Sequence, residues 1–384
     1  MLKVGIIGTG AIAPSHIEGY LEFPERCKIV ALCDIYPEKA EKSAEKYNLE
    51  VDIYDSHQKM LDRNDLDLIS VCTPPYTHAE ITTDFLNADT NVICEKPMAS
   101  SLNECDSMNA AAEKNKKLLS VISQNRFTNP MMKLKKVLES ELVGEIVHTQ
   151  VDSFWWRGYA YYDLWWRGTW EKEGGGPTLN HAVHHIDIFR WMNGMPAEIN
   201  AVMSNTSHDN AEVEDISIAI GKYSDGSLAQ ITSSVVHHGQ EQQLIFQGKK
   251  ARVSVPWDVY AFTAKENGFP EKNNELEIEL ENFYNGLEDL DYEGHTGQID
   301  NVLTALEDES EVLIDGNDGR KTLELITAIY QSATFNKKID LPLTEKSPFY
   351  SREGLINNAH KFYKKKKSIE NFTDTEITTG RNLE

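Results

Sequence analysis

The chain has 384 residues, of which 40% are hydrophobic, and a formal net charge of −23 at pH 7. The length predicts two domains, each large enough for its own core, and the composition is that of a globular protein. The negative charge excludes nucleic acid and anionic membrane surfaces as partners, because both would repel the chain. No apolar run approaches the roughly 18 residues of a membrane span.

The start of the chain and its cysteines indicate a cytoplasmic protein. The first ten residues lead an apolar stretch straight into a glycine turn, which is not the layout of a secretory signal. The five cysteines are odd in number and all lie in the first third of the chain. Three of them fall in strand-like apolar runs, so we expect buried and reduced thiols.

Strands and helices alternate along roughly the first 125 residues. Short apolar runs at 3–8, 27–35, 66–74, 91–97 and 117–124 predict strands. Helical segments at 10–23 and 37–48 separate the first of them, the second with proline at its start. Apolar strands separated by helices predict an α/β fold with a parallel sheet.

The first turn carries a dinucleotide-binding pattern. Gly8 and Gly10 are followed by Ala13 in the third glycine position, an accepted variant, and Asp34 ends the next strand. Glycines let the backbone approach a pyrophosphate at the helix N-terminus. Asp34 would accept hydrogen bonds from the adenosine ribose and repel a 2′-phosphate, so we expect NAD as the cofactor rather than NADP. The residues expected at the cofactor in this region are Gly8, Gly10, Ala11, Ile12 and Asp34.

Two further strand ends, "TPPYTH" at 73–78 and "EKP" at 95–97, should line the same crevice. Ligands of open α/β sheets bind at the carboxyl ends of the strands. Lys96 stands directly before a proline at the end of a buried strand, where a casual surface lysine is not expected. We therefore interpret Lys96 as a functional residue.

These features together resemble the glucose–fructose oxidoreductase/inositol dehydrogenase/MocA (Gfo/Idh/MocA) family of oxidoreductases. The matching segments include "GIIGTGAIA", "EKPMA", "QNRF", "WWRGTW" and "GGGPTLNHAVHHID", in the family's order over nearly the whole chain. The resemblance implies a Rossmann domain at 1–125. A C-terminal α+β domain with a large, open, mostly antiparallel sheet follows at 126–384. Its last helix, at about 348–367, would pack back on the first domain.

The resemblance also assigns roles to individual residues. Lys96 would lie beside the nicotinamide and the reacting hydroxyl, and Glu95 would contact the nicotinamide ribose. Pro74 and His78 occupy positions that touch the cofactor in relatives, and Trp166 and Arg167 match a pair that reaches the cofactor or the substrate. Thr73 and Asn125 are further residues that we expect at the cofactor. The residues that we expect at the substrate are Lys96, Arg126, Tyr162, Trp165, Asn180, His181 and His184.

The segment "NHAVHHIDIF" at 180–189 allows two interpretations. On one helix His181 and His185 would share a face, which suits a zinc pair, whereas Asn180, His184 and Asp187 would share another. No cysteine lies in this part of the chain and no acidic residue stands at ligand spacing, so we expect no metal. By the resemblance, His184 is the catalytic histidine, and Asn180 stands where many members have aspartate.

Oxidation of a secondary alcohol needs a hydride acceptor and a base. We assign His184 as the base and Lys96 as the cation that orients and polarises the hydroxyl. The reverse assignment, with a deprotonated Lys96 as base, stays open, because the two groups would titrate as a pair. Asn180 can hydrogen-bond but cannot relay a proton.

The segment 154–170 is rich in aromatic residues and holds five of the seven tryptophans. It is either packing or a wall against which a sugar ring lies. A single arginine, Arg167, is poor evidence for an acidic sugar, so the sequence favours a neutral pyranoside or cyclic polyol. Oxidation at C3 of a glycoside is a plausible reaction.

Two other functions use the same residues. Some members of the family keep NAD bound, oxidise a sugar transiently, eliminate the aglycone and reduce the product, which amounts to glycoside cleavage. A non-catalytic, sugar-sensing relative is the second alternative, and the presence of both Lys96 and His184 argues against it. Since relatives use the open sheet for assembly, we expect a homodimer or homotetramer.

Overall fold

The computed structural model describes residues 1–370 and 372, and its chain forms two compact units. The first unit holds Met1–Thr128 and Leu290–Leu323. The second holds Asn129–Asp289 and the chain from Glu324 onward. The sequence assigned everything after residue 125 to one C-terminal domain, whereas the structure returns Leu290–Leu323 to the first unit.

A six-stranded, wholly parallel sheet forms the centre of the first unit, in the order β3-β2-β1-β4-β5-β6. Its apolar strands are fully buried over most of their length, as the runs without alternating polar residues predicted. This is the Rossmann arrangement, and the predicted fold is confirmed. The strands are β1 (Leu2–Ile7), β2 (Cys27–Cys33), β3 (Asp52–Tyr54), β4 (Leu68–Val71), β5 (Asn91–Cys94) and β6 (Leu119–Val121).

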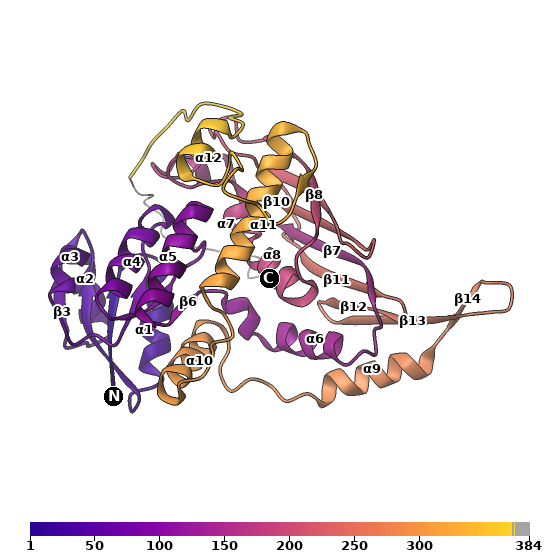
Figure 1. Ribbon diagram of the computed structural model, residues 1–384, viewed down its shortest axis with the longest axis horizontal. Coiled ribbons are helices and arrows are strands. Elements are labelled where there is room, and N and C mark those ends of the chain that lie inside the picture. The colour runs from indigo at the N-terminus through magenta and orange to yellow at the C-terminus, as the bar shows by residue number, and fades with distance from the viewer. Residues whose placement is uncertain (371, 373–384) are drawn as a thin grey trace. The chain divides into compact units, whose positions relative to one another are not determined.

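The helices of the first unit follow the strands, except for one that arrives late in the chain (Figure 1). They are α1 (Ala13–Leu21), α2 (Pro37–Lys46), α3 (His57–Leu61), α4 (His78–Asn87), α5 (Leu102–Asn115) and α10 (Gly294–Asp308), with short 3-10 turns η1 (Pro75–Thr77) and η2 (Gln124–Phe127). The unit also contains the start of α11 (Gly316–Phe335), as far as Leu323.

Helix α10 explains why Leu290–Leu323 belongs to the first unit. Ile299, Val302 and Leu303 are fully buried in the same apolar cluster as Ile17 of α1. Arg26, which precedes β2, reinforces the contact with ion pairs to Asp300 and Glu307 of α10. Burial of this apolar stripe outweighs the position of α10 in the chain, and the sequence carried no sign of the return.

A nine-stranded sheet forms the second unit, in the order β14-β13-β12-β11-β7-β10-β9-β8-β15. Only β7 and β10 pair in parallel, so the predicted mostly antiparallel sheet is confirmed. The strands are β7 (Ile146–Phe154), β8 (Glu198–Ser204), β9 (Ile216–Lys222), β10 (Leu228–Ser234), β11 (Gln242–Gly248), β12 (Ala251–Val255), β13 (Asp258–Ala264), β14 (Pro270–Lys272) and β15 (Ile339–Asp340).

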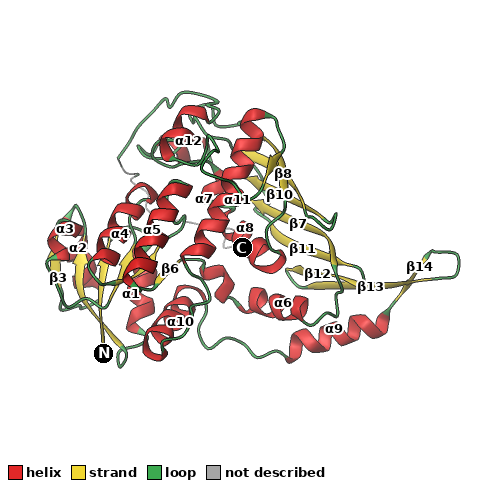
Figure 2. Ribbon diagram, viewed as in Figure 1, coloured by secondary structure: helices red, strands yellow, loops and turns green. Residues whose placement is uncertain are grey.

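Helices cover one face of this sheet, and residues on its other face stay exposed (Figure 2). The helices of the second unit are α6 (Asn129–Glu139), α7 (Pro177–Asn180), α8 (Val183–Asn193), α9 (Asn274–Gly286), the later part of α11 (Gly316–Phe335) and α12 (Arg352–Asn358), with the 3-10 turn η3 (Tyr159–Asp163). Strands β8 and β9 alternate buried and exposed residues, the pattern of a half-covered antiparallel sheet.

The predicted C-terminal helix at about 348–367 is much shorter in the structure. Helix α12 ends at Asn358, and the chain then runs in extended form along residues 162–167 of its own unit. Lys365 donates to the carbonyl oxygens of Tyr162, Leu164 and Arg167 at 2.6 to 2.8 Å. These three bonds favour the extended path over a helix.

The histidine-rich helix is interrupted. A turn at His181 and Ala182 separates α7 from α8, so Asn180 ends one helix and His184 lies in the first turn of the next. The continuous helix assumed for the spacing argument is therefore wrong.

The five cysteines are buried and free, as predicted. Within the described residues, no helix is long and apolar enough to cross a membrane.

Candidate active site

The glycine turn between β1 and α1 is built as a dinucleotide-binding turn requires. Gly8 has a φ of +89°, and a Cβ on it would lie 2.7 Å from the carbonyl oxygen of Cys72. Only glycine fits there. Gly10 and Ala11 are exposed and Ile12 is partly exposed just before the first turn of α1. The turn thus leaves its backbone accessible to a phosphate.

Asp34 lies directly beside this turn. Its Oδ2 accepts hydrogen bonds from the backbone N–H of Thr9 at 2.8 Å and from the Thr9 hydroxyl at 2.9 Å. Its Oδ1 accepts from the N–H of Tyr36 at 2.9 Å. The carboxylate is fixed at the end of β2 and stays partly exposed, the position expected for the ribose of the cofactor.

Glu95 lies in a buried cluster with His16 of α1 and His295 of α10, and the sequence did not predict either partner. Nε2 of His16 lies 3.1 Å and Nε2 of His295 lies 3.2 Å from Oε1 of Glu95. Burial alone would raise the pKa of Glu95, but the hydrogen bonds from both histidines outweigh burial and hold this pKa well below its usual value. Glu95 is therefore an anion, and its Oε2 accepts from the backbone N–H of Lys96 at 3.1 Å.

The loops that follow β4 and β5 are tied together by His78. This side chain is fully buried, with Nδ1 2.9 Å from the carbonyl oxygen of Pro97 and Nε2 2.7 Å from that of Thr73. His78 thereby positions Thr73 and Lys96, and its own contact with a cofactor stays a prediction. Pro74 is exposed and Lys96 is partly exposed at the same strand ends.

The structure does not support the predicted substrate contact of Arg126. Its side chain is completely buried in the first unit, where it pairs with Asp318 at 3.4 Å and donates to the carbonyl oxygen of Leu313. A guanidinium held in this way stabilises the return of Leu290–Leu323. Asn125, its neighbour in η2, is partly exposed.

In the second unit, the three glycines before α7 make room for a buried carboxylate. A Cβ on Gly176 would lie 2.1 Å from the carbonyl oxygen of Glu214. The Glu214 carboxylate accepts hydrogen bonds from the N–H groups of Gly176 and Thr178 at 3.1 Å and from the Tyr330 hydroxyl at 3.0 Å. Burial raises the pKa of Glu214 to about 7. This carboxylate fixes the start of α7.

The three histidines of 181–185 have different surroundings. His185 is buried, its Nδ1 lies 3.0 Å from Oγ of Ser153, and burial lowers its pKa to about 4. His184 is partly exposed at the start of α8. His181 packs its ring against Trp155 and Tyr161, with centroids 5.7 and 5.8 Å apart. These surroundings give His185 a packing role and leave His184 accessible for chemistry.

Asn180 is held by the glycine segment. Its Nδ2 donates to the carbonyl oxygen of Gly175 at 2.9 Å and to that of Gly176 at 3.3 Å. The amide is thus oriented by backbone at the end of α7.

The aromatic segment 154–170 contains both packing and accessible residues. Tyr162 is 1% exposed and packs edge-on against His208, so the structure does not support its predicted substrate contact. Trp165 is 36% exposed, with Nζ of Lys172 4.9 Å from its ring centroid. Arg167 lies 4.2 Å from the ring centroid of Trp166 and pairs with buried Glu173 at 3.4 Å.

Two groups of side chains in the described part of the chain have donor atoms close enough to hold a metal ion. They are His16, Glu95 and His295 in the first unit, and His57, Glu80 and Asp84 on α3 and α4. The hydrogen bonds within the first group already account for its geometry. The histidines of α8 belong to neither group.

The predicted site residues divide between the units. The glycine turn, Asp34, Glu95 and Lys96 lie in the first unit, whereas Asn180, His184 and Arg167 lie in the second. A Rossmann sheet with this turn and a fixed carboxylate at the end of β2 defines an NAD-binding oxidoreductase.

Comparison with known proteins identifies the family. Residues 2–123 match the model of the oxidoreductase family with an NAD-binding Rossmann fold, and residues 131–254 match the GFO/IDH/MocA C-terminal domain. The chain belongs to the GFO/IDH/MocA family of oxidoreductases, and NAD is its cofactor.

The chain is similar to several named enzymes. D-Glucoside 3-dehydrogenase of Escherichia coli is 25% identical over 363 residues, which cover 88% of this chain and 97% of the relative. The 2,7-anhydro-N-acetylneuraminate hydratase of Mediterraneibacter gnavus is 25% identical over 292 residues, covering 74% and 76%. A solved structure of the WlbA dehydrogenase from Bordetella pertussis, with NADH and UDP-GlcNAcA, matches at a TM-score of 0.77. It is 27% identical and covers 89% of this chain and 99% of that one.

Proposed function

We propose that the chain transfers a hydride between NAD and a ring secondary hydroxyl of a sugar, glycoside or inositol. The observation that carries the proposal is the likeness to D-glucoside 3-dehydrogenase, which extends over nearly the full length of both chains. The glycine turn and Asp34 supply the cofactor site for this reaction. The likeness also supports C3 of a glycoside as the position oxidised.

Lys96 and His184 are the proposed catalytic pair. Bound NAD supplies the hydride acceptor. The Lys96 ammonium orients the substrate hydroxyl and stabilises negative charge on its oxygen, and His184 accepts the hydroxyl proton at a ring nitrogen. Asn180 orients the site through its amide and takes no proton. The anionic Glu95 accepts from the backbone N–H of Lys96 and so helps to fix the lysine at the end of β5.

Redox-neutral cleavage is the second candidate, and one observation favours it. A relative that covers 74% of this chain is named a hydratase. Hydration involves no net oxidation, so a relative of this chain is named for a redox-neutral reaction. The hydride would pass to bound NAD and return after the aglycone is eliminated and water is added, while the same lysine and histidine would stabilise charge and transfer protons.

A substrate panel tests both candidates. Cyclic polyols, sugars and glycosides are supplied with NAD, and NADH absorbance and released aglycone are measured in parallel. A dehydrogenase produces NADH in proportion to the substrate consumed, whereas redox-neutral cleavage releases aglycone without net NADH. Turnover of acyclic hydroxy acids alone would contradict both.

Lys96→Met tests the catalytic pair on the same assay. We expect turnover to fall by about a hundredfold or more with NAD affinity largely unchanged, because the lysine acts mainly in the transition state. NAD affinity is measured by quenching of tryptophan fluorescence. A variant that loses NAD affinity and keeps kcat would show that Lys96 serves the cofactor and not the reaction.

A further inference from the structure

Two arginines of the second unit lie against the same tyrosine. The guanidinium carbon of Arg167 is 4.0 Å from the ring centroid of Tyr161, and that of Arg157 is 5.7 Å from it. Arg167 also donates a hydrogen bond to the Tyr161 hydroxyl. Two permanent positive charges therefore meet at one aromatic ring.

The described part of the chain supplies little negative charge to balance this pair. Arg167 contacts Glu173, but burial raises the pKa of Glu173 to about 7, so this carboxyl carries only part of its charge at neutral pH. Arg157 makes no ion pair with any of the described residues. Its Nη1 donates to two neutral oxygens, the carbonyl of Trp156 at 2.7 Å and Oε1 of Gln240 at 3.3 Å.

This arrangement is costly unless an anion completes it. Arg157 is half-buried, and both burial and the nearby charge of Arg167 lower its pKa. The chain has 61 acidic residues and only 38 lysines and arginines, yet among the residues that the structure describes no carboxylate pairs with Arg157. The N–H donors of a guanidinium match the paired oxygens of a carboxylate or phosphate. Such an anion would neutralise the positive charge and accept hydrogen bonds from the guanidinium.

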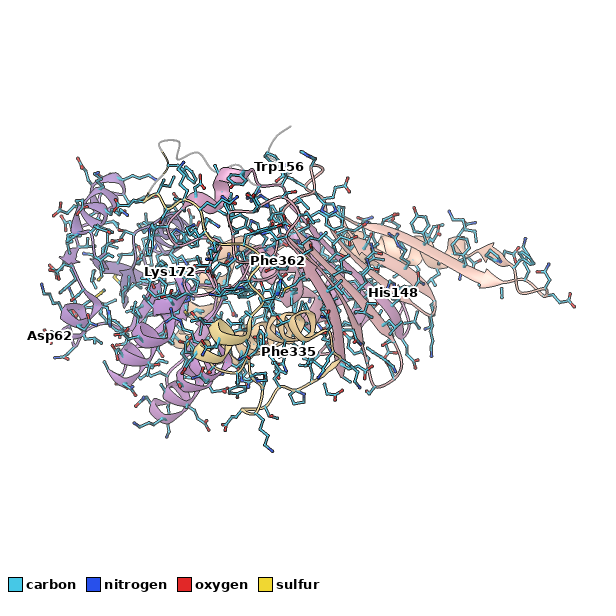
Figure 3. All side chains as sticks on the ribbon, turned by 90° about the horizontal axis from the view of Figure 1, so that it is seen from above. Asp62, His148, Trp156, Lys172, Phe335 and Phe362 are labelled. Atoms are coloured by element: carbon cyan, nitrogen blue, oxygen red, sulfur yellow. The ribbon has the colours of Figure 1, made fainter. Side chains whose placement is uncertain are left out.

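The arginines stand beside the proposed substrate site. Arg157 lies 5.5 Å from the ring centroid of Trp155, and Trp155 and Tyr161 both pack on His181. We call Trp155, Arg157, Tyr161, Arg167 and His181 the arginine–aromatic cluster. His181 is three residues from His184. Trp156 is next to Arg157 in the chain, is 42% exposed and lies at the edge of the second unit (Figure 3).

We propose that the arginine–aromatic cluster binds an oxyanion carried by the substrate, and that Arg157 determines this specificity. The substrate is then an acidic sugar whose ring packs on the aromatic side chains while a carboxylate or phosphate meets the arginines. The inference rests on the proposed function. It revises the expectation of a neutral sugar, which depended on Arg167 being the only arginine.

Matched pairs of sugars test the proposal on the full chain with saturating NAD. Glucose is compared with glucuronate and with glucose 6-phosphate, and methyl glucoside with methyl glucuronoside. We expect kcat/KM for an acidic member to exceed that of its neutral partner by about tenfold or more. Preference for glucuronate over glucose 6-phosphate would assign the oxyanion to a carboxylate, and the reverse preference would assign it to a phosphate. Equal or better turnover of the neutral members would overturn the proposal.

Arg157→Gln should lower kcat/KM for the preferred acidic sugar by about tenfold or more and leave the neutral partner within about twofold. Arg157→Lys keeps the charge without the N–H donors of a guanidinium and should recover part of the loss. Arg252→Gln is the matched control, because Arg252 also lies over a tyrosine ring, that of Tyr260 on the sheet. Circular dichroism and Tm establish that each variant is folded. A raised KM for NAD with unchanged sugar kinetics would overturn the proposal, since Arg157 would then serve the cofactor.

A binding measurement separates this inference from the proposed reaction. Calorimetry measures the affinity of the same acidic and neutral sugars for the protein–NADH complex. Arg157-dependent binding of an acidic sugar without any turnover would refute the proposed function and support the cluster. Turnover of neutral sugars without binding of acidic ones would do the opposite. No binding of acidic sugars at millimolar concentration would refute the cluster as an oxyanion site.

Discussion

We expect Asp34 to determine which dinucleotide the first unit accepts. Three donors from Thr9 and Tyr36 hold its carboxylate beside the glycine turn. A 2′-phosphate on the adenosine ribose would bring a second negative charge to this carboxylate. We expect NAD to be preferred over NADP by about tenfold or more in kcat/KM, which is roughly 1.4 kcal/mol.

Steady-state kinetics with both cofactors check this preference. Asp34→Ala should reduce the preference for NAD over NADP. Asp55→Ala is the control and should leave this preference unchanged, because Asp55 pairs with Lys59 at the surface of the first unit. Comparable kcat/KM for the two cofactors in the wild-type protein would show that Asp34 does not select between them.

Neighbouring histidines of α8 are expected to respond differently to removal. His184→Ala should abolish the part of the pH–rate profile that titrates near neutrality, because the base is lost. His185→Ala should keep kcat and lower the free energy of unfolding by about 1–3 kcal/mol, because a buried hydrogen bond to Ser153 is removed.

Rate profiles and thermal unfolding of the two variants distinguish these roles, and a chelator is added to the wild-type assay. Activity should survive the chelator, because the predicted mechanism uses no metal. Loss of activity that zinc restores would instead support a metal site.

For single residues, the sequence indicated the expected chemical role better than the side-chain partners and the burial. Glu95 was expected at the cofactor ribose, but nothing in the spacing showed that His16 and His295 would hold it, since His295 is 200 residues away. Arg126 and Tyr162 were expected at the substrate, and both side chains are buried. Burial depends on tertiary packing, which a motif does not record.

Helix α7 depends on a carboxylate that is hard to ionise. The pKa of Glu214 is about 7 in the folded protein because of burial, well above that of an unfolded glutamate. At a pH between the pKa of Glu214 in the unfolded chain and its pKa in the folded protein, the folded protein holds a proton on Glu214 that the unfolded chain releases. Stability therefore rises as the pH falls from about 8 to about 6, by on the order of 1 kcal/mol from this group.

Glu214→Gln should remove this contribution. Its Tm should change less between the two pH values than that of the wild type, while Glu266→Gln, at an exposed position of the same unit, should behave like the wild type. Differential scanning calorimetry at both pH values measures the difference. An equal pH response in the wild type and Glu214→Gln would show that Glu214 is ionised in both states.

Among the elements, periodicity predicted strands well and helix ends poorly. The buried strands of the first unit appear where the apolar runs predicted them. The turn at His181 and the short α12 were missed because each depends on distant groups. Glu214 fixes the start of α7, and the carbonyls of residues 162–167 hold Lys365 in an extended segment.

The uncovered face of the nine-stranded sheet predicts assembly of the whole molecule. Val202, Ile218, Ile220 and Leu228 are exposed by 60%, 42%, 51% and 43%, and Ile218 and Val202 are paired neighbours on adjacent strands. A contiguous apolar surface of this kind is typical of an interface between subunits. We expect a homodimer or homotetramer that buries this face.

Light scattering at micromolar concentration measures the mass. Ile220→Lys should lower the mass toward that of one chain without unfolding the sheet, because the side chain already points outward. Ile278→Lys, a change of another exposed isoleucine, on α9, is the control. A strictly monomeric wild-type protein would contradict the prediction.

At the scale of the molecule, the sequence predicted both architectures and missed how the chain is shared between them. The Rossmann pattern and the alternating strands define two domains with a simple boundary. The return of Leu290–Leu323 to the first unit depends on an apolar stripe on α10. An apolar stripe in a sequence predicts that a helix face is buried, but it does not indicate against which core the helix packs. Only the complementary surface on α1 selects the partner.

This return has a consequence for synthesis of the protein on the ribosome. The six strands of the first unit emerge early, but Ile299, Val302 and Leu303, which complete its core, emerge only after most of the second unit. Until then α1 exposes an apolar face, and an open carboxylate at Glu95 has one of its two histidine partners. The core of the first unit therefore stays incomplete while most of the second unit is synthesised. We expect misfolding and chaperone binding to be most frequent in ribosome-bound chains that stop before residue 290.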